Sequence, residues 1–281
     1  MNYHKARPKL YVMDNGRLSM DANLLIAGSN QATNAEPSKP NEMVKFPIYT
    51  VLIDHPEGKI LFDTACNPDS MGSEGRWPDA VQVGFPLDQP EECYLPHRLE
   101  QLGVRPEDIS FVVCSHLHMD HAGCLELFTR AKIIVHRDEL NGALNVYAHR
   151  ESSGAYIWDD IDAWMKNGLM WEPIEPDKAS IKLAEGVEVL NFGSGHAWGM
   201  LGLQVELEEK GTIILASDAL YTKDSAGPPL RPPGIIYDSI GWQKTANYIK
   251  ALAKDRGADI WYGHDANQFE AFRKSTDGYY E

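Results

Sequence analysis

Ser115-His116-Leu117-His118-Met119-Asp120-His121 is the stretch from which the fold of this 281-residue chain can be predicted. It places three imidazoles and one carboxylate within six residues. A His-x-His-x-Asp-His pattern arises in roughly one in a thousand shuffled chains of this composition, so chance is a poor explanation. Imidazole and carboxylate ligands suit zinc and other borderline divalent ions, such as iron, manganese and cobalt. The stretch therefore predicts a metal site.

The residues before this stretch indicate how its side chains are held. Residues 109–114 (Ile-Ser-Phe-Val-Val-Cys) form a nearly continuous apolar run, which is typical of a buried strand. The metal-binding side chains then lie on the turn that leaves a rigid strand. His116 and His118, two residues apart, can converge on one ion. Asp120 and His121 turn the chain toward a second ion beside the first.

Two ions need more ligands than this motif offers, and the second half of the chain supplies three candidates. Apolar strands are predicted at residues 187–192, 212–217 and 259–262, and they are followed by His196, Asp218 and His264. A buried histidine at a strand end is more often a hydrogen-bonded structural residue than a ligand. Beside a four-ligand motif, the ligand interpretation is favoured. Asp218 is the natural bridge, because one carboxylate can give an oxygen to each ion.

Composition and charge narrow the classes of partner. The chain is 43% apolar, which is ordinary for a globular protein with a sizeable core. Its formal net charge of −15 repels phosphate backbones, so a nucleic-acid partner is not expected. The four cysteines are scattered without a Cys-x-x-Cys pair, which favours free thiols in a reducing compartment over disulfides. No signal-peptide pattern opens the chain and no apolar run approaches membrane-spanning length, so we expect a cytoplasmic protein without membrane contact.

Turn and periodicity signals divide the chain into strand-rich halves. Asp14-Asn15-Gly16 and residues 55–58 are hairpin signals, the second between strands at 46–53 and 59–66. Residues 28–45, 67–90 and 227–234 read as loops. Apart from those already given, strands are expected at 9–13, 132–136 and 201–207, and helices at 91–102, 125–128, 138–148, 156–164, 239–254 and 267–273. This order predicts an α/β fold of two sheets packed face to face with outer helices.

The series His116-x-His118-x-Asp120-His121, His196, Asp218, His264 resembles the metallo-β-lactamase superfamily in its two-metal form. Within it the chain is most similar to the N-acyl-homoserine lactonases that inactivate quorum-sensing signals, and the likeness spans nearly the whole chain. The resemblance implies a four-layer αβ/βα sandwich, one domain over 1–281 with pseudo-related halves of roughly 1–185 and 186–281. Di-iron redox members usually place Glu at the His118 position. Secreted zinc β-lactamases typically have Cys at the Asp218 position and a signal peptide.

The same resemblance assigns the ligands and the reaction. It implies two divalent ions per chain, zinc first and iron, cobalt or manganese as alternatives. One ion is held by His116, His118 and His196, the other by Asp120, His121 and His264, and Asp218 bridges them. It also implies a hydrolase in which a metal-bridging hydroxide attacks the lactone carbonyl.

Three further residues are given roles beside the ions. Tyr221 resembles the family tyrosine that hydrogen-bonds the substrate carbonyl and the developing oxyanion; the alternative is a residue that closes a strand end. Asp120 could relay the proton to the leaving alkoxide, although a ligating carboxylate is normally acidic. Asp63 either orients a ligand imidazole or caps a turn.

The acyl chain of such a substrate needs an apolar wall. Residues that flank the expected rim, and that are otherwise core or hairpin packing, are Leu18, Met20, Leu24, Phe46, Tyr156 and Ile236. A homodimer is expected by resemblance, with residues 67–90 as the interface and Trp77 and Phe85 as docking side chains.

Two other functions remain open at this point. One is another hydrolase of the same fold, acting on thioesters, aryl esters or phosphodiesters. Glutathione-thioester hydrolases usually carry a basic helical C-terminal region, whereas only seventeen mixed residues follow His264 here. The other is a catalytically silent binding module, which would be expected to lose ligands, whereas all seven are present.

Overall fold

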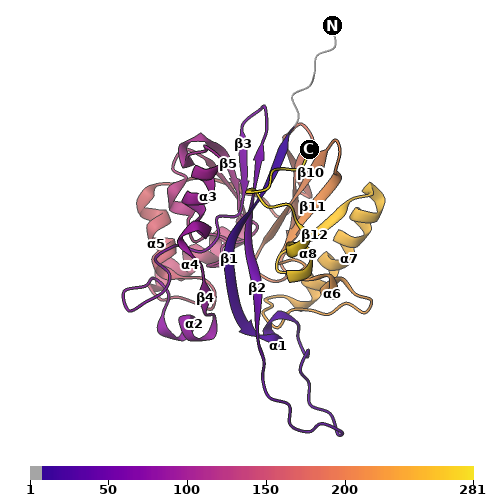
Figure 1. Cartoon of the computed structure of the whole chain (residues 1–281). Coiled ribbons are helices and arrows are strands. Elements are labelled where there is room, and N and C mark those ends of the chain that lie inside the picture. Colours follow the sequence, from indigo (N-terminus) through magenta and orange to yellow (C-terminus); the bar gives the residue numbers. More distant parts are fainter. Residues whose placement is uncertain (1–7) are drawn as a thin grey trace.

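Two mixed β-sheets face one another in the computed structural model, which describes residues 8–281. Helices cover the outer face of each sheet, so the molecule has the expected four-layer αβ/βα arrangement (Figure 1). The first sheet has seven strands in the order β4-β1-β2-β3-β5-β6-β7. Their bounds are β1 Lys9–Asp21, β2 Met43–Asp54, β3 Lys59–Phe62, β4 Leu87–Asp88, β5 Ile109–Val113, β6 Lys132–His136 and β7 Met170–Ile174.

The second sheet has five strands in the order β12-β11-β10-β9-β8. Their bounds are β8 Ser180–Ala184, β9 Val187–Gly193, β10 Met200–Leu207, β11 Gly211–Ser217 and β12 Asp259–Tyr262. The α-helices are α1 Ala22–Leu25, α2 Asp79–Gly84, α3 Leu95–Gln101, α4 Arg137–His149, α5 Trp158–Asn167, α6 Lys223–Ala226, α7 Ser239–Arg256 and α8 Ala266–Ala271. Short 3₁₀ helices lie at Glu91–Cys93, Pro106–Asp108 and Leu125–Leu127.

Side chains along each strand of the first sheet point alternately to its two faces, and each face packs into its own hydrophobic core. In β3, Ile60 and Phe62 face the second sheet, whereas Leu61 faces the helices of the first half. Alternation follows from the two-residue period of a strand, and both sets are apolar because both faces of the sheet are covered. The first helical layer is formed by α3, α4 and α5, and α7 covers the second sheet.

The hairpin expected at Asp14-Asn15-Gly16 is wrong. β1 runs through these residues and pairs with β2 on both sides of them, with a register shift between Asp14 and Arg17. Asn15 is fully buried, its side chain donates to the Cys93 carbonyl, and it accepts a hydrogen bond from Thr50. The Asn-Gly pair therefore makes a β-bulge inside one long strand, with Gly16 at a φ of 101°.

Several other elements also differ from expectation. The strand expected at 59–66 ends at Phe62, because Asp63 and Ala65 take positive φ values of 61° and 56°. The helix expected at 91–102 is split at Tyr94, whose ψ of 135° is extended. Strands β7 and β8 were not predicted, since their residues are largely half-exposed and give no clear apolar run.

Two expectations about composition can be compared with the structure. All four cysteines are free, as predicted, and all four are buried. Among residues 8–281, no helix combines the length and the apolar character needed to cross a membrane.

Candidate metal centre

The strand order brings all seven predicted ligands to one edge of the sandwich. β3 and β5 are parallel neighbours, so the residues after them, Asp63 and the His116–His121 stretch, leave the first sheet together. In the second sheet β11 and β12 are parallel, and β9 runs in the same direction because β10 is antiparallel to both β9 and β11. His196, Asp218 and His264 therefore also leave their strands at one edge. The two sets of strand ends meet at the rim.

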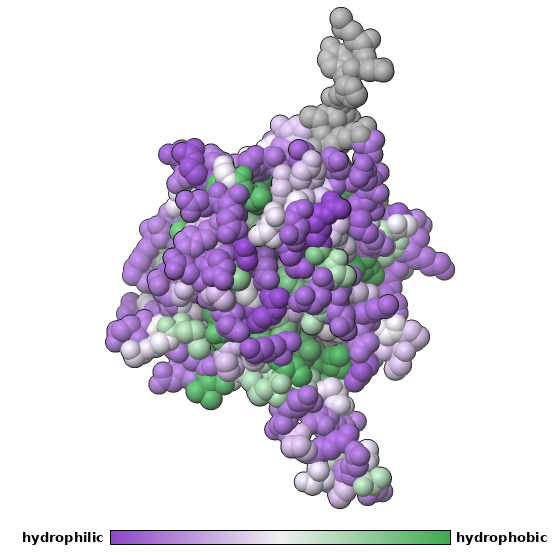
Figure 2. Space-filling model, in the orientation of Figure 1, coloured by the Kyte–Doolittle hydropathy of each residue, from purple (hydrophilic) through white to green (hydrophobic). Residues whose placement is uncertain are grey.

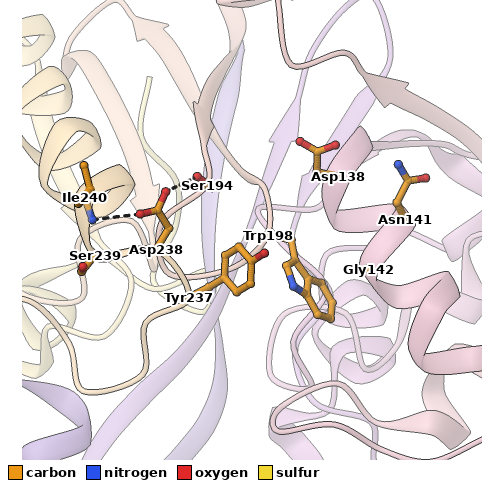
Figure 3. A pocket seen from close by; sticks show the side chains of 9 residues that line it. All are labelled: Asp138, Asn141, Gly142, Ser194, Trp198, Tyr237, Asp238, Ser239 and Ile240. Atoms are coloured by element: carbon orange, nitrogen blue, oxygen red, sulfur yellow. Dashed lines mark hydrogen bonds between the residues drawn. The ribbon is translucent and has the colours of Figure 1, made fainter. Parts of the chain in front are cut away.

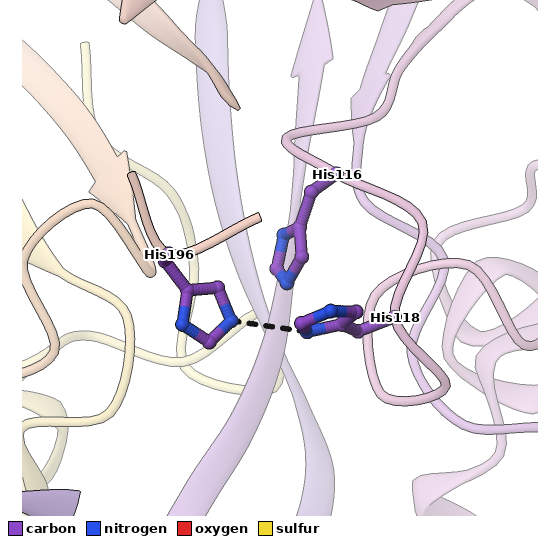
Figure 4. A group of neighbouring side chains, drawn as sticks. All are labelled: His116, His118 and His196. Atoms are coloured by element: carbon purple, nitrogen blue, oxygen red, sulfur yellow. Dashed lines mark hydrogen bonds between the residues drawn. The ribbon is translucent and has the colours of Figure 1, made fainter. Parts of the chain in front are cut away.

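One group of nitrogens belongs to His116, His118 and His196, whose candidate ligand atoms lie within 4.8 Å of one another. The three rings come from two loops and point toward a common centre (Figure 4). His118 Nδ1 and His196 Nε2 are 3.0 Å apart. All three side chains are buried, at 0%, 6% and 3% exposure respectively.

A second group consists of Asp120, His121 and His264. The Asp120 carboxylate lies 3.4 Å from His121 Nε2 and 3.6 Å from His264 Nε2. Asp218 stands between the two groups. Its Oδ2 is 3.3 Å from His196 Nε2, and its Oδ1 is 3.1 Å from His264 Nε2. Each oxygen of this carboxylate therefore faces a different group, which is the arrangement that a bridging ligand requires.

Hydrogen bonds on the outer nitrogens decide which nitrogen of each ring is free. The Nδ1 atoms of His196 and His264 lie 2.9 and 3.0 Å from the carbonyl oxygens of Ile235 and Pro47. A carbonyl can only accept, so each Nδ1 carries a proton and each Nε2 is the nitrogen left to face the centre. His121 Nδ1 lies 2.8 Å from the Asp63 carboxylate, which has the same effect. Metal ligands in proteins are oriented in this way.

The centre also contains polar atoms without a hydrogen-bond partner. His116 Nε2, His121 Nε2 and Asp218 Oδ1 are buried and unpaired among the described residues. A buried polar atom without a partner is costly, and such atoms in a native structure point to an ion or a water. Since two imidazole nitrogens and one carboxylate oxygen, all atom types that bind metals, face one small space, the residues present fit divalent metal ions.

Electrostatics support the same conclusion. Burial and the neighbouring imidazoles hold the pKa of His116 and of His118 well below the usual histidine range, so both rings are neutral. Burial also lowers the pKa of His121, but Asp218 and Asp120 outweigh it and raise that pKa well above the usual range. The carboxylates thus retain protons on neighbouring imidazoles when no cation is present. Divalent cations would replace these protons.

Asp63 joins the two sheets beneath the centre. Its carboxylate accepts hydrogen bonds from the backbone N–H of Ser115 at 2.7 Å and from the Ser115 hydroxyl at 2.8 Å. The oxygen that accepts from the Ser115 hydroxyl, Oδ2, also contacts His121 Nδ1. Asp63 therefore orients an imidazole, which is one of the two roles predicted for it. The Ser217 hydroxyl bonds to the Ser115 hydroxyl at 2.8 Å, which ties the residue before Asp218 to the residue before His116.

Tyr221 lies across both groups of the centre. Its ring packs edge-on against His264, with centroids 5.1 Å apart, and tilted against His196 at 5.2 Å. The hydroxyl is 3.4 Å from His196 Nδ1, a long contact to a nitrogen already bonded to Ile235. Burial raises the pKa of Tyr221 well above the usual range, so the hydroxyl keeps its proton. It is available to donate to another acceptor.

An apolar wall adjoins Tyr221 and contains three of the predicted acyl-chain residues. We define this wall as Leu18, Met20, Phe46, Ile48, Ala65, Cys66, Trp77, Met119, Ile157 and Tyr221. Leu24 packs against it from the rim, and the Phe46 ring lies 4.6 Å from His264. Tyr156 instead sits beside His118, at 4.5 Å between rings. Ile236 packs with the α7 core, and its neighbour Ile235 is the residue that packs against the wall.

Two cavities lie near the rim, and they differ in their relation to the centre. One of about 880 Å³ opens between α4 and the start of α7 and is lined by Trp198 and Tyr237 (Figure 3). None of the seven cluster residues lines it. The other, of about 600 Å³, is lined by His264 together with Leu25, Ile26 and Thr222. This second cavity, on the α1 side of the rim, therefore borders the centre at His264.

The surface around that side is apolar. Green patches gather at the lower edge of the face in Figure 2, where α1 and α2 lie in Figure 1. Leu25, Val81 and Phe85 are partly buried against the wall, and Val83 is 79% exposed. An apolar surface thus continues from the buried wall to solvent.

Several residues at the site were not predicted. Trp77 was expected at a docking surface, yet it is 1% exposed and forms part of the wall. Met119 lies between two ligands in the sequence, so its position could have been inferred from the motif. Glu139 is fully buried beside the His116 loop, and no signal indicated this, because a Glu in the first turn of a helix is ordinarily a surface residue.

Comparison with known proteins identifies the family to which this chain belongs. A family model described as the metallo-beta-lactamase superfamily matches residues 43–264. The N-acyl homoserine lactonase AiiB of Agrobacterium fabrum is 43% identical to the chain over 273 residues, which span 97% of this chain and 99% of that protein.

Two solved structures share the fold over nearly the whole length. An N-acyl homoserine lactone hydrolase with the product N-hexanoyl-L-homoserine at its catalytic metal centre matches with a TM-score of 0.81 and 26% identity, covering 97% of this chain and 99% of that one. A variant of Bacillus thuringiensis AiiA with N-decanoyl-L-homoserine at its active site matches with the same TM-score of 0.81, identity of 26% and coverage of 97% and 99%.

Proposed function

The chain belongs to the metallo-beta-lactamase superfamily, and from this premise we propose that it is a metal-dependent hydrolase that opens the lactone ring of N-acyl homoserine lactones. The observation that carries the proposal is the full-length similarity to AiiB at 43% identity. The buried cluster of imidazoles and carboxylates at the rim supports it, since this cluster is suited to two divalent ions. Such ions, when bound, supply a hydroxide nucleophile at neutral pH and polarise the ester carbonyl.

We assign seven side chains to the metals. His116, His118 and His196 would hold one ion, Asp120, His121 and His264 would hold the other, and Asp218 would bind both. The outer hydrogen bonds support this assignment because they occupy Nδ1 of His196 and of His264 and leave Nε2 of each ring as the atom that can bind an ion. Zinc is the proposed metal, since imidazole and carboxylate ligands suit it and its filled d shell imposes no coordination geometry.

Tyr221 binds the substrate carbonyl and stabilises the oxyanion that develops on it. Its hydroxyl is neutral, lies 3.4 Å from His196 Nδ1 and also interacts with Asp218, so it faces both groups of the centre and can donate to a substrate oxygen bound there. An oxyanion-hole donor of this kind typically contributes about 2.7–4 kcal/mol to lowering the barrier.

Asp120 moves a proton. The lactone ring oxygen leaves as an alkoxide, which is a poor leaving group without a proton. Asp120 lies beside His121 and His264, whose charges lower the pKa of this carboxyl despite its burial. A carboxylate here can take the proton released by the nucleophile and pass it to the ring oxygen. Asp63 keeps His121 oriented during these steps.

The acyl chain lies along the apolar wall. Leu18, Met20 and Phe46 provide its buried surface and Leu24 its rim, with Tyr156 beside His118 and Ile236 next to Ile235, which packs against the wall. Each methylene buried there contributes about 0.8 kcal/mol, so two more carbons improve binding by roughly fifteenfold at most.

The alternative substrate classes are thioesters, aryl esters and phosphodiesters. A hydrolysis assay with a pH indicator separates them, using metal-loaded enzyme and acyl homoserine lactones of several chain lengths beside one thioester and one phosphodiester. We expect kcat/KM for the lactones to be at least about tenfold higher, a difference of roughly 1.4 kcal/mol in transition-state binding. Equal or faster turnover of the thioester would overturn the substrate assignment while leaving the metal assignment intact.

Assembly and setting are further parts of the proposal. We propose a cytoplasmic enzyme, because its four cysteines are free thiols. We also propose a homodimer that uses residues 67–90, where Val83 is 79% exposed on α2. Light scattering on the eluting protein measures the mass directly, and a mass of one chain at micromolar concentration would refute the dimer. The proposed biological role is quenching of quorum-sensing signals.

A further inference from the structure

Glu139 is a carboxylate enclosed by the metal-binding loops but assigned to neither ion. It lies in the first turn of α4 and is 0% exposed. Its Oε1 accepts hydrogen bonds from the backbone N–H of Leu117 and from the Tyr156 hydroxyl, both at 2.9 Å. Its Oε2 accepts from the backbone N–H of Gly199 at 3.1 Å. The partners of Glu139 are therefore neutral donors from three different segments.

Those donors surround one group of imidazoles. Leu117 stands between His116 and His118, and Gly199 follows His196 by three residues. The Tyr156 ring lies edge-on to His118 at 4.5 Å and stacks on Trp198 at 4.1 Å. One oxygen of Glu139 thus holds the loop of His118, and the other holds the loop of His196. These two histidines are 78 residues apart in sequence, and their facing nitrogens are 3.0 Å apart.

Close packing around the two loops leaves little freedom for them to move separately. A Cβ on Gly199 would lie 2.0 Å from His136 Nδ1, and a Cβ on Gly142 would lie 1.9 Å from the Trp198 ring. His136 caps α4 by accepting a hydrogen bond from Asp138. The loop after His196 is therefore pressed against the start of α4, where Glu139 lies. Glycine at both points allows this approach.

A buried carboxylate without a cation is costly, and burial raises the pKa of Glu139 to about 7. The three hydrogen bonds, together with the backbone N–H of Trp198, act in the opposite direction and favour its charged form. A neutral side chain of the same shape would avoid the cost of burial. What it would lose is the pair of accepting oxygens that joins the two loops.

We propose that Glu139 is a positioning residue that sets the separation between His118 and His196, and thereby the affinity of the ion that they hold with His116. This inference rests on the proposed function for the identity of the ligands. The inference predicts that loss of Glu139 weakens this ion and not the other. The side chains of the other ion have hydrogen bonds of their own, from His121 to Asp63 and from His264 to the Pro47 carbonyl.

The test is Glu139→Gln. Glutamine has nearly the same shape but offers one accepting oxygen and one N–H₂ donor, so it cannot accept from Leu117 and Gly199 at once. Metal-free protein is titrated with Co²⁺, and binding is followed by visible absorption and calorimetry. We expect one ion to bind as in the wild type and the other to bind about 10–100-fold more weakly, the usual cost of losing such a support.

A matched control is available in Asp160→Asn. Asp160 is also a buried carboxylate, 1% exposed, and burial raises its pKa to about 8. Its partner is Arg76 at 3.1 Å, and no ligand-bearing loop bonds to it in the described residues. This variant should lower the melting temperature and leave both Co²⁺ affinities unchanged.

Tyr156→Phe gives a second variant should Glu139→Gln fail to fold. It removes one donor to Oε1 and keeps both loop contacts, so the same ion should weaken by a smaller factor. Unchanged affinities in the folded variants, or equal weakening of both ions, would overturn the inference. Co²⁺ binding is measured without substrate. A wild-type protein that binds two ions but does not hydrolyse lactones would therefore refute only the proposed function.

Discussion

The metal centre and the apolar wall meet at Tyr221 but are held in different ways. In the centre, the outer nitrogens of His121, His196 and His264 each contact one carbonyl or carboxylate oxygen. In the wall, side chains such as Met20 and Trp77 are fixed only by non-directional packing. Directed hydrogen bonds allow one arrangement of each ring, whereas apolar packing tolerates many shapes of similar volume. We therefore expect all-or-none effects from substitutions in the centre and graded effects in the wall.

The largest effect is expected from Asp218→Ala. Removing the carboxylate whose two oxygens face both imidazole groups should abolish hydrolysis and bound metal together. Metal per chain is measured by elemental analysis of purified protein, beside the lactone assay. Asp224→Ala, six residues away in α6 and exposed, is the matched control and should retain both properties. An Asp218→Ala protein that still holds two ions would remove the bridge from the mechanism.

Tyr221→Phe should show that a directed contact can act on the reaction without affecting the metals. We expect kcat for the lactone to fall by about 10²–10³, the cost of one oxyanion-hole donor, with metal content unchanged. The ring contacts to His196 and His264 remain in phenylalanine, so the fold is preserved. An unchanged kcat would show that the hydroxyl takes no part in the reaction.

Trp77→Leu tests the graded behaviour of the wall. The smaller side chain leaves room for a longer acyl chain, so the ratio of kcat/KM for substrates two carbons apart should shift by up to roughly fifteenfold. Trp164→Leu is the matched control, since both tryptophans are 1% exposed with an unpaired Nε1, and Trp164 packs against the helices of the first half. Both variants should melt at lower temperature. The same shift in both would contradict the role given to the wall.

The smallest effect is expected for a hydrogen-bonded ion pair on the solvent-exposed surface. Arg137 donates to Glu175 at 2.6 Å, with side chains 37% and 49% exposed. Arg137→Ala should lower the free energy of unfolding by only about 0.2–1 kcal/mol, because solvent screens such a pair. Chemical denaturation measures this change. A loss of unfolding free energy as large as that of a core substitution would contradict this expectation. It would show that hydrogen bonds in the centre are not stronger because they are buried.

The parts that could be predicted are those written in short stretches of sequence. Each proposed ligand follows an apolar strand within eight residues, so strand prediction alone places the ligands at strand ends. The same local logic fails at Asn15, which has the sequence of a turn and the structure of a bulge. Its side chain is satisfied by Thr50 and by the Cys93 carbonyl, which lies 78 positions away. Trp77 was misjudged for the same reason, since its burial depends on β1 and β2.

The sequence by itself determined the chemistry of this protein, because residue type and spacing along one strand end decide which atoms can bind a metal. Only the tertiary structure decided which nitrogen of each histidine faces inward and which buried carboxylate joins the two loops. His264 is oriented by Pro47, and Glu139 reaches Gly199 across 60 positions. Contacts between segments so far apart exist only after the two sheets have packed, so no local pattern encodes them.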